Sequence, residues 1–368
     1  MKNSNEILLS LLRSALWDSP PDDIDFIPDW SEVLISAERQ TVTGLVATAI
    51  TGLPAGLKPD PAQMRKLQAR MMRIYQSHAL LNRKVAETVS RLNAAGIRSV
   101  LLKGQGTALN YHDPLARQCG DIDLYVGERQ FLQTLQTMSP GKEHKFSRQR
   151  YPKHFNISED GVEIEIHRLA DSLPGAKADK AFQKWTLHHL EESELRIAAI
   201  GGVEINLPPA EFDALYIMNH AWHHFLIGGI GLRQICDWTM HLHRFHKVID
   251  SKKLAADLDT FGLTRAWQIF ASLAIRKLGL PVEECPLYNG EADMLAEKVM
   301  DMIWAEGNFG YHSILRKDPR PDGFIAGKLY TFRINTLRVF RIMSICPMDM
   351  IRYWIDFLTN GIMKVIYR

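Results

Sequence analysis

Residues 101–126 read LLKGQGTALNYHDPLARQCGDIDLYV, and the fold class follows from this stretch. The short apolar run at residues 98–102 is typical of a β-strand, and the glycines after it predict a turn that leads into a helix. Residues 121–126 alternate polar and apolar side chains, as a strand with one buried face does. A strand, a turn, a helix and a second strand in close succession predict a compact unit of mixed structure.

Further strands and helices are expected around this unit. Residues 128–138 have a helical pattern, and strand patterns follow at residues 154–158, 162–167 and 203–207. The rest of the chain has apolar residues at helical spacing. We therefore expect an α/β (α+β) protein in which a small mixed β-sheet is flanked by helical regions.

The expected domain organisation has three parts: an N-terminal helical region (1–97), a sheet-containing core (98–207) and a C-terminal helical region (208–368). The clearest helix begins at Asp60 and Pro61, where an N-cap residue precedes a proline at the first helical position. Its apolar residues keep a regular spacing until Gly96, which is expected to end it.

Composition excludes several classes of protein. The 368 residues are 46% hydrophobic and 23% charged, which is typical of a folded globular protein. A net charge of +2 does not imply a nucleic-acid partner. The four cysteines form no Cys-x-x-Cys pair, so a disulfide framework and a cysteine zinc site are not expected. This cysteine usage fits the cytoplasm. We expect no signal peptide and no transmembrane segment.

Two carboxylates on one predicted strand suggest a metal site. Asp121 and Asp123 are two residues apart, so their side chains point to the same face of the strand. Like charges at this separation repel, and a divalent cation relieves the repulsion. Carboxylates together with substrate phosphates are typical Mg²⁺ ligands. Glu163 and Glu165, on the strand at 162–167, could each supply a third carboxylate.

The turn before these aspartates suggests a phosphate site. A strand that ends at Lys103 and Gly104 and leads into a helix presents backbone N–H groups to an anion. Arg117 could add a bidentate guanidinium. Each part alone has a simpler interpretation, since an Asp-x-Asp pair is often a solvated strand edge and Lys-Gly-x-Gly a plain helix start. Their order and spacing together favour phosphoryl or nucleotidyl transfer.

This stretch resembles the signature of an uncharacterised bacterial nucleotidyltransferase family of the polymerase-β superfamily. The matching residues, in order, are Lys103, Gly104, Tyr111, Pro114, Arg117, Asp121 and Asp123. Residues 164–167, IEIH, are similar to the family's third acidic strand, in which an acid stands two residues before a histidine. The resemblance therefore selects Glu165 as the third carboxylate, with Glu163 as the fallback.

A second stretch extends the resemblance. Residues 215–224, LYIMNHAWHH, and residues 231–237, GLRQICD, are similar to a His-x₃-His helix and a downstream aspartate of the same family. Four further residues are candidates for the lining of a binding cleft, namely His167, His220, His224 and Asp237.

The function implied by the resemblance is transfer of a nucleoside monophosphate from a nucleoside triphosphate, ATP in first place, to a hydroxyl acceptor. Mg²⁺ is the implied cofactor, with Asp121, Asp123 and Glu165 as ligands and catalytic residues. Lys103, Gly104 and Arg117 would bind the phosphates. Thr107 would supply the hydroxyl that a Gly-Ser pair gives in the wider superfamily. The acceptor is not identified by any motif.

Two other functions stay open at this point. His220 and His224 lie four residues apart on one predicted helix face, as two zinc ligands of a hydrolase would. No Glu follows His220, however, as it would in a His-Glu-x-x-His site. The other alternative is a nucleotide-binding module that has lost its catalytic activity.

The C-terminal segment is basic and apolar. Between Lys328 and Arg368 there are seven basic and two acidic residues. We expect a terminal helix pair that packs on the α/β core. The alternative is a basic amphipathic surface that lies on an anionic membrane.

Overall fold

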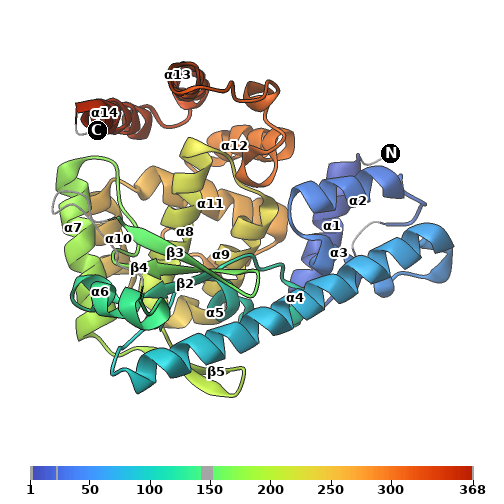
Figure 1. Cartoon of the computed structure of the whole chain (residues 1–368). Helices are drawn as coiled ribbons and strands as arrows, with labels where there is room; N and C mark the ends of the chain where they lie inside the picture. Colours follow the sequence, from blue (N-terminus) through green and yellow to red (C-terminus); the bar gives the residue numbers. More distant parts are fainter. Residues whose placement is uncertain (1–2, 22–23, 142–151, 367–368) are drawn as a thin grey trace.

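A computed structural model of the chain describes residues 3–21, 24–141 and 152–366. It confirms the expected class, because a small sheet lies among many helices (Figure 1). The N-terminal region is helical. Its elements are α1 (Ser4–Trp17), α2 (Trp30–Arg39), α3 (Thr43–Thr51), the 3₁₀ turn η1 (Ala55–Leu57) and α4 (Pro61–Ala94).

Helix α4 begins and ends as predicted. The Asp60 side chain accepts hydrogen bonds from the backbone N–H groups of Ala62 and Gln63, which satisfies two donors of the first turn. After Ala94 the chain leaves the helix through Gly96, whose φ is +70°. Figure 1 shows α4 running along one side of the molecule, from the N-terminal helices to the sheet.

The core contains two sheets and their connecting helices. Its elements, in chain order, are β1 (Val100–Leu101), α5 (Gly104–Ala108), η2 (Pro114–Ala116), β2 (Ile122–Tyr125), α6 (Gly127–Met138), β3 (His154–Glu159), β4 (Val162–His167), α7 (Ala176–Leu187), η3 (His188–Glu192), β5 (Arg196–Ile200) and β6 (Val203–Leu207). Strand β5 was not expected from the sequence pattern; it forms a hairpin with β6.

The four-stranded sheet has the order β1-β2-β4-β3. Strands β2 and β4 are parallel, whereas β1 and β3 pair with them antiparallel, so the sheet is mixed. Ile122, Leu124, Ile164 and Ile166 pack in one apolar core with side chains of α4 and α6. Since side chains alternate along a strand, Asp123 and Glu165 lie on the opposite face of the sheet.

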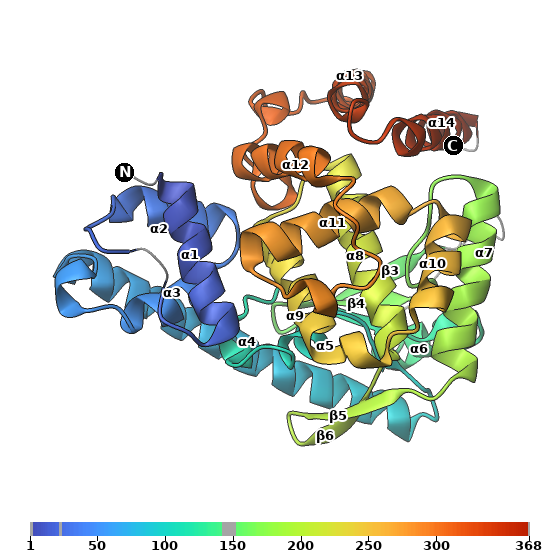
Figure 2. The same cartoon turned by 180° about the vertical axis from the view of Figure 1, so that it is seen from behind.

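The C-terminal region is helical. Its elements are α8 (Ala210–Ile227), α9 (Leu232–Phe245), η4 (His246–Val248), α10 (Ser251–Phe261), α11 (Thr264–Leu278), η5 (Val282–Glu284), α12 (Asp293–Glu306), η6 (Asn308–Gly310), η7 (Ile314–Arg316), α13 (Phe324–Ile342) and α14 (Pro347–Ile366). Side chains of α8, α9 and α11 share one large apolar cluster with α1 and α3, so the two terminal regions pack together. Figure 2 shows the same arrangement from behind.

None of the described helices is long and apolar enough to cross a membrane. The domain limits at residues 97 and 207 stay a prediction.

Candidate active site

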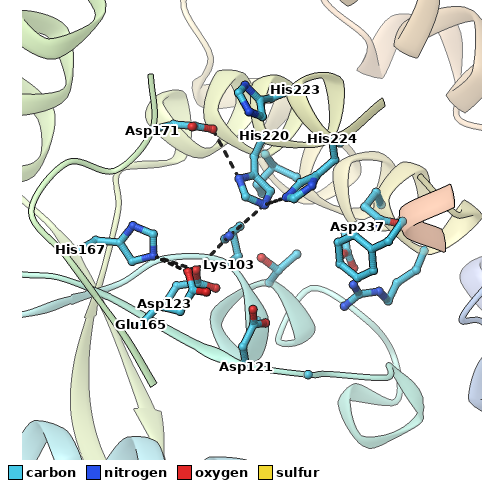
Figure 3. A pocket seen from close by; sticks show the side chains of 18 of the residues that line it. Lys103, Asp121, Asp123, Glu165, His167, Asp171, His220, His223, His224 and Asp237 are labelled. Carbon is cyan, nitrogen blue, oxygen red and sulfur yellow. Dashed lines mark hydrogen bonds and ion pairs between the residues drawn. The ribbon is translucent and has the colours of Figure 1, made fainter. Parts of the chain in front are cut away.

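One cavity of about 460 Å³ brings the candidate residues together. It lies between the polar face of β2 and β4 on one side and helices α8 and α9 on the other (Figure 3). All eleven residues selected from the sequence line it: Lys103, Gly104, Thr107, Arg117, Asp121, Asp123, Glu165, His167, His220, His224 and Asp237. Their individual roles stay predictions.

Three carboxylates meet because of the strand register. In the parallel pair β2–β4, Asp123 lies directly opposite Glu165. Asp121 is exposed just before β2, and one carboxylate oxygen of each acid lies within 4.8 Å of those of the other two. Hard oxygen ligands at this spacing fit a divalent cation such as Mg²⁺. Glu163 is exposed and does not line this cavity, so the geometry favours Glu165.

Two basic side chains, Lys103 and His167, lie against the carboxylates. Lys103 Nζ and His167 Nε2 each lie 3.0 Å from Asp123 Oδ1. Burial raises the pKa of Asp123, but the positive charge of Lys103 and the His167 hydrogen bond together hold that pKa well below its usual range. Asp123 is therefore ionised in the cavity although its residue is only 3% exposed.

His167 is surrounded by acceptors. Its Nδ1 lies 3.2 Å from the Leu169 carbonyl oxygen, and its Nε2 also lies 3.2 Å from Glu165 Oε2. Burial lowers the pKa of His167, but the hydrogen bonds to Asp123 and Glu165 outweigh burial and raise it. Both ring nitrogens face oxygen acceptors, and the imidazole ring links β2 and β4 on the cavity side.

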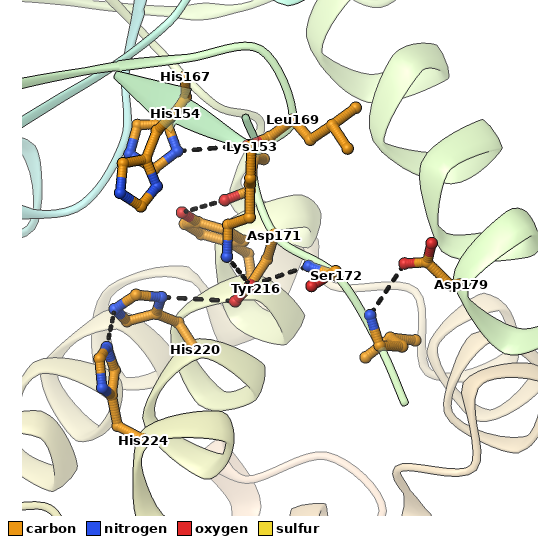
Figure 4. Close-up of polar contacts among 12 residues, drawn as sticks. Lys153, His154, His167, Leu169, Asp171, Ser172, Asp179, Tyr216, His220 and His224 are labelled. Atoms are coloured by element: carbon orange, nitrogen blue, oxygen red, sulfur yellow. Dashed lines mark hydrogen bonds and ion pairs between the residues drawn. The ribbon is translucent and has the colours of Figure 1, made fainter. Parts of the chain in front are cut away.

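The helix α8 brings histidines to the opposite wall. His220 Nδ1 lies 3.4 Å from Asp171 Oδ2 (Figure 4), and its Nε2 lies 3.0 Å from both Lys103 Nζ and His224 Nε2 (Figure 3). Burial and the charge of Lys103 lower the pKa of His220 to about 4. Burial lowers the pKa of His224 to about 2. Both histidines are therefore neutral at physiological pH.

The arrangement of these histidines does not resemble a zinc site. Among the described residues, the two groups of three or more side chains that could hold a metal are His154 with Glu165 and His167, and Asp121 with Asp123 and Glu165. Neither group contains His220 or His224.

Arg117 has a different partner from the one expected. Its Nε and Nη2 donate to the two carboxylate oxygens of Asp237 on α9, each at 2.7 Å, and Nη1 contacts Cys119. The Tyr111 hydroxyl donates to Asp237 as well. Arg117 is only 3% exposed, and its guanidinium group is hydrogen-bonded to other residues of the protein. This geometry favours a positioning role for Arg117 over direct phosphate binding.

The turn at Lys103 needs unusual backbone angles. Lys103 has φ 36° and Gly104 has φ 54°, and both values lie in the left-handed region that favours glycine. These angles direct the chain from β1 into α5 and place Lys103 over Asp123. Thr107, on α5, is buried at the cavity wall.

Several cavity residues were not selected from the sequence. Lys153 pairs with the buried carboxylate of Asp171, and nothing in the local pattern indicated either residue. Arg233 lies within the GLRQICD stretch and could have been selected. One of its N–H groups donates to the Gln118 carbonyl oxygen, while its buried Nε has no hydrogen-bond partner among the described residues.

Comparison with known proteins identifies a family. The sequence pattern of a family described as uncharacterised nucleotidyltransferase matches residues 28–279. The chain belongs to this family. The part of the chain that matches the nucleotidyltransferase family includes the four-stranded sheet and the helices α8 and α9. It therefore includes nearly all of the residues that line the cavity.

Two other comparisons add little. No curated protein matches the chain. The crystal structure of an antigenic nucleotidyltransferase-like protein from Paracoccidioides brasiliensis is similar over 55% of this chain and 92% of that chain, with 14% sequence identity and a TM-score of 0.29. A likeness at this TM-score does not contribute to the assignment.

Proposed function

We propose that this chain is a Mg²⁺-dependent nucleotidyltransferase of the polymerase-β type. It would transfer a nucleoside monophosphate from a nucleoside triphosphate, with ATP as the first choice, to a hydroxyl group of an acceptor. The observation that supports this most directly is the grouping of Asp121, Asp123 and Glu165 in one cavity. The family assignment supports the general reaction.

The three carboxylates would hold the metal. Bound there, Mg²⁺ would neutralise charge on the phosphate oxygens and make the acceptor hydroxyl easier to deprotonate. His167 bonds both Asp123 and Glu165 and fixes their orientation, as groups behind metal ligands often do. Lys103 already contacts Asp123 and would move its ammonium group toward the entering phosphates.

Basic side chains in the cavity wall would bind the phosphates. Lys103, Lys153 and Arg233 come from three separate elements and all line the cavity. Arg233 offers a buried Nε–H that has no acceptor within the described part of the chain, and a phosphate oxygen would satisfy it. Arg117 would hold α9 in place through Asp237, so that Arg233 on the same helix is correctly positioned.

The proposed reaction is an in-line displacement at the α-phosphorus. The acceptor oxygen forms a bond to this phosphorus, and the bond to the oxygen that bridges to the β-phosphorus breaks. The proton of the acceptor hydroxyl passes to Glu165, and pyrophosphate leaves with the electron pair of the broken bond.

The test is incubation of the full chain with each nucleoside triphosphate labelled at the α-phosphate, in Mg²⁺, with and without cell extract. We expect pyrophosphate release and a labelled acceptor in the extract, and neither from the Asp123→Ala variant. Tight nucleotide binding by calorimetry without pyrophosphate release under any condition would favour the catalytically inactive binding module.

A further inference from the structure

The last two helices carry an unusual number of exposed apolar side chains. The described part of the chain has 23 exposed large apolar residues, and ten of them lie on α13 and α14. They are Phe324, Ile325, Leu329, Phe332, Leu337, Phe340, Met348, Ile351, Ile355 and Leu358. Such a concentration on a short segment marks an interaction surface, since scattered single residues are the norm.

The apolar residues of α13 form a stripe on its outer side. Ile325, Leu329, Phe332 and Phe340 recur at helical spacing and are 73%, 64%, 46% and 72% exposed. The inner side of the same helix is packed, because Arg338 donates to the Leu226 carbonyl oxygen and pairs with Glu306. The helix is thus held to the protein on one side and presents apolar side chains on the other.

Helix α14 also carries exposed apolar side chains. Met348, Ile351, Ile355 and Leu358 follow one another at spacings of three and four residues, which places them on one side of the helix. The two helices are joined by a hydrogen bond from the Tyr353 hydroxyl to Asn335 and by a ring contact between Phe332 and Trp354. Figures 1 and 2 show α13 and α14 as the outermost layer beyond α12. We call the ten exposed residues and the cations beside them the α13–α14 face.

The charges of the α13–α14 face are positive. Lys328 and Arg333 are exposed beside the stripe, and α13 contains no acidic residue. On α14 the acidic residues are half-buried, and Asp356 accepts a hydrogen bond from the backbone N–H of Gly175. The exposed residues of the preceding loop add three basic and two acidic side chains, namely Arg316, Lys317, Arg320, Asp318 and Asp322.

We propose that the α13–α14 face binds the surface of an anionic lipid bilayer. Apolar side chains along two adjoining helices would enter the boundary between head groups and acyl chains, while Lys328 and Arg333 contact lipid phosphates. A second copy of the chain fits less well, because a symmetric contact would bring the same cations toward each other. The side chains of Lys364 and Arg368, which add to the basic excess of this segment in the sequence, lie outside the described residues.

The test is co-sedimentation of the full chain with vesicles. One set contains phosphatidylcholine alone, and the other also contains phosphatidylglycerol. We expect binding to the second set, with weaker binding in high salt. The triple variant Ile325→Ser, Leu329→Ser, Phe340→Ser removes three exposed apolar side chains, so we expect about tenfold weaker binding with an unchanged melting temperature.

Matched controls separate the α13–α14 face from general effects. Ile197, Val248 and Met294 are equally exposed apolar residues elsewhere, and their triple serine variant should bind vesicles like the native chain. The pair Lys328→Glu, Arg333→Glu should lose the preference for phosphatidylglycerol, whereas Arg65→Glu, Lys66→Glu on α4 should keep it.

Three results would overturn the proposal. The first is failure of the native chain to bind either vesicle set in low salt. The second is equal binding by the face variant and its control. The third is a native dimer in sedimentation velocity that the face variant dissociates while vesicles have no effect, which would identify a second copy as the occupant. None of these readouts depends on nucleotide transfer.

Discussion

Arg117 and Asp237 form a bidentate ion pair between the loop before β2 and helix α9. Both guanidinium–carboxylate distances are 2.7 Å, and the two residues are 3% and 5% exposed. The bidentate geometry matches the planar fork of arginine, which lysine cannot reproduce. The pair joins the segment that carries Asp121 and Asp123 to the helix that carries Arg233.

Loss of this ion pair should destabilise the protein. In Arg117→Ala the Asp237 carboxylate stays buried, and among the residues that the structure describes only the Tyr111 hydroxyl still donates a hydrogen bond to it. We expect the free energy of unfolding to fall by about 3–5 kcal/mol, the usual result of breaking a buried ion pair. Urea unfolding followed by circular dichroism measures this.

Arg276 on α11 provides the control, because its ion pair with Asp293 lies on the surface. Arg276→Ala should change the free energy of unfolding by less than about 1 kcal/mol. A chain with Arg117→Ala that keeps native stability but binds nucleotide poorly would contradict the positioning role and restore the phosphate-binding role expected from the sequence.

Loss of the Arg233 side chain should weaken nucleotide binding and leave the stability of the protein nearly unchanged. Its Nη1 group makes one hydrogen bond to a carbonyl oxygen, and its Nε has no partner among the described residues. Arg233→Ala should weaken binding of a nucleoside triphosphate by about 1.5–3 kcal/mol, the range for hydrogen bonds to a charged group. Calorimetric titration checks the affinity, and the melting temperature should stay close to the native value. Equal affinities of native and variant chains would exclude Arg233 from the phosphate site.

The sequence indicated for a physical reason that the candidate carboxylates lie close together. Alternation on a strand places Asp121 and Asp123 on one side, and a polar pair in an otherwise apolar strand is visible in the pattern alone. The apolar residues that alternate with them, Ile122 and Leu124, indicated the buried face, which the structure confirms. The class of fold was predictable from the same periodicity.

Ion pairs between residues that are far apart in the sequence were not predictable. The sequence shows that Arg117 is close to Asp121 along the chain. Only the packing of α9 shows that the Arg117 guanidinium binds the carboxylate of Asp237. Asp171 and Lys153 follow no periodic pattern and meet through tertiary structure. Strand β5 was missed although Gly201 and Gly202 stand between two apolar runs, which is a hairpin signal.

Lys103 should compete with a divalent cation. Its ammonium group lies 3.0 Å from Asp123 Oδ1, an oxygen that the proposed metal would also use. Lys103→Met removes this charge, so the affinity for Mn²⁺ without nucleotide should rise about tenfold. Electron paramagnetic resonance of free Mn²⁺ measures it. Lys84→Met, which breaks an ion pair with Asp160 away from the cavity, should leave the Mn²⁺ affinity unchanged. Weaker Mn²⁺ binding by Lys103→Met would show that the lysine supports the site.

Glu165 and Glu163 offer a matched pair on one strand. Both lie on β4, two residues apart, but only Glu165 is opposite Asp123 and close to His167, whereas Glu163 is opposite Ser158 and exposed. Removing the charge of Glu165 takes away one oxygen ligand and the proposed proton acceptor, so Glu165→Gln should slow nucleotide transfer by roughly 100-fold or more. Glu163→Gln should stay within about twofold of the native rate, because a surface substitution on the same strand changes little. Label transfer from the α-phosphate gives the rates, and Mn²⁺ titration of each variant shows whether the loss follows metal binding. The reverse order, with Glu163→Gln the slower enzyme, would move the third carboxylate to Glu163.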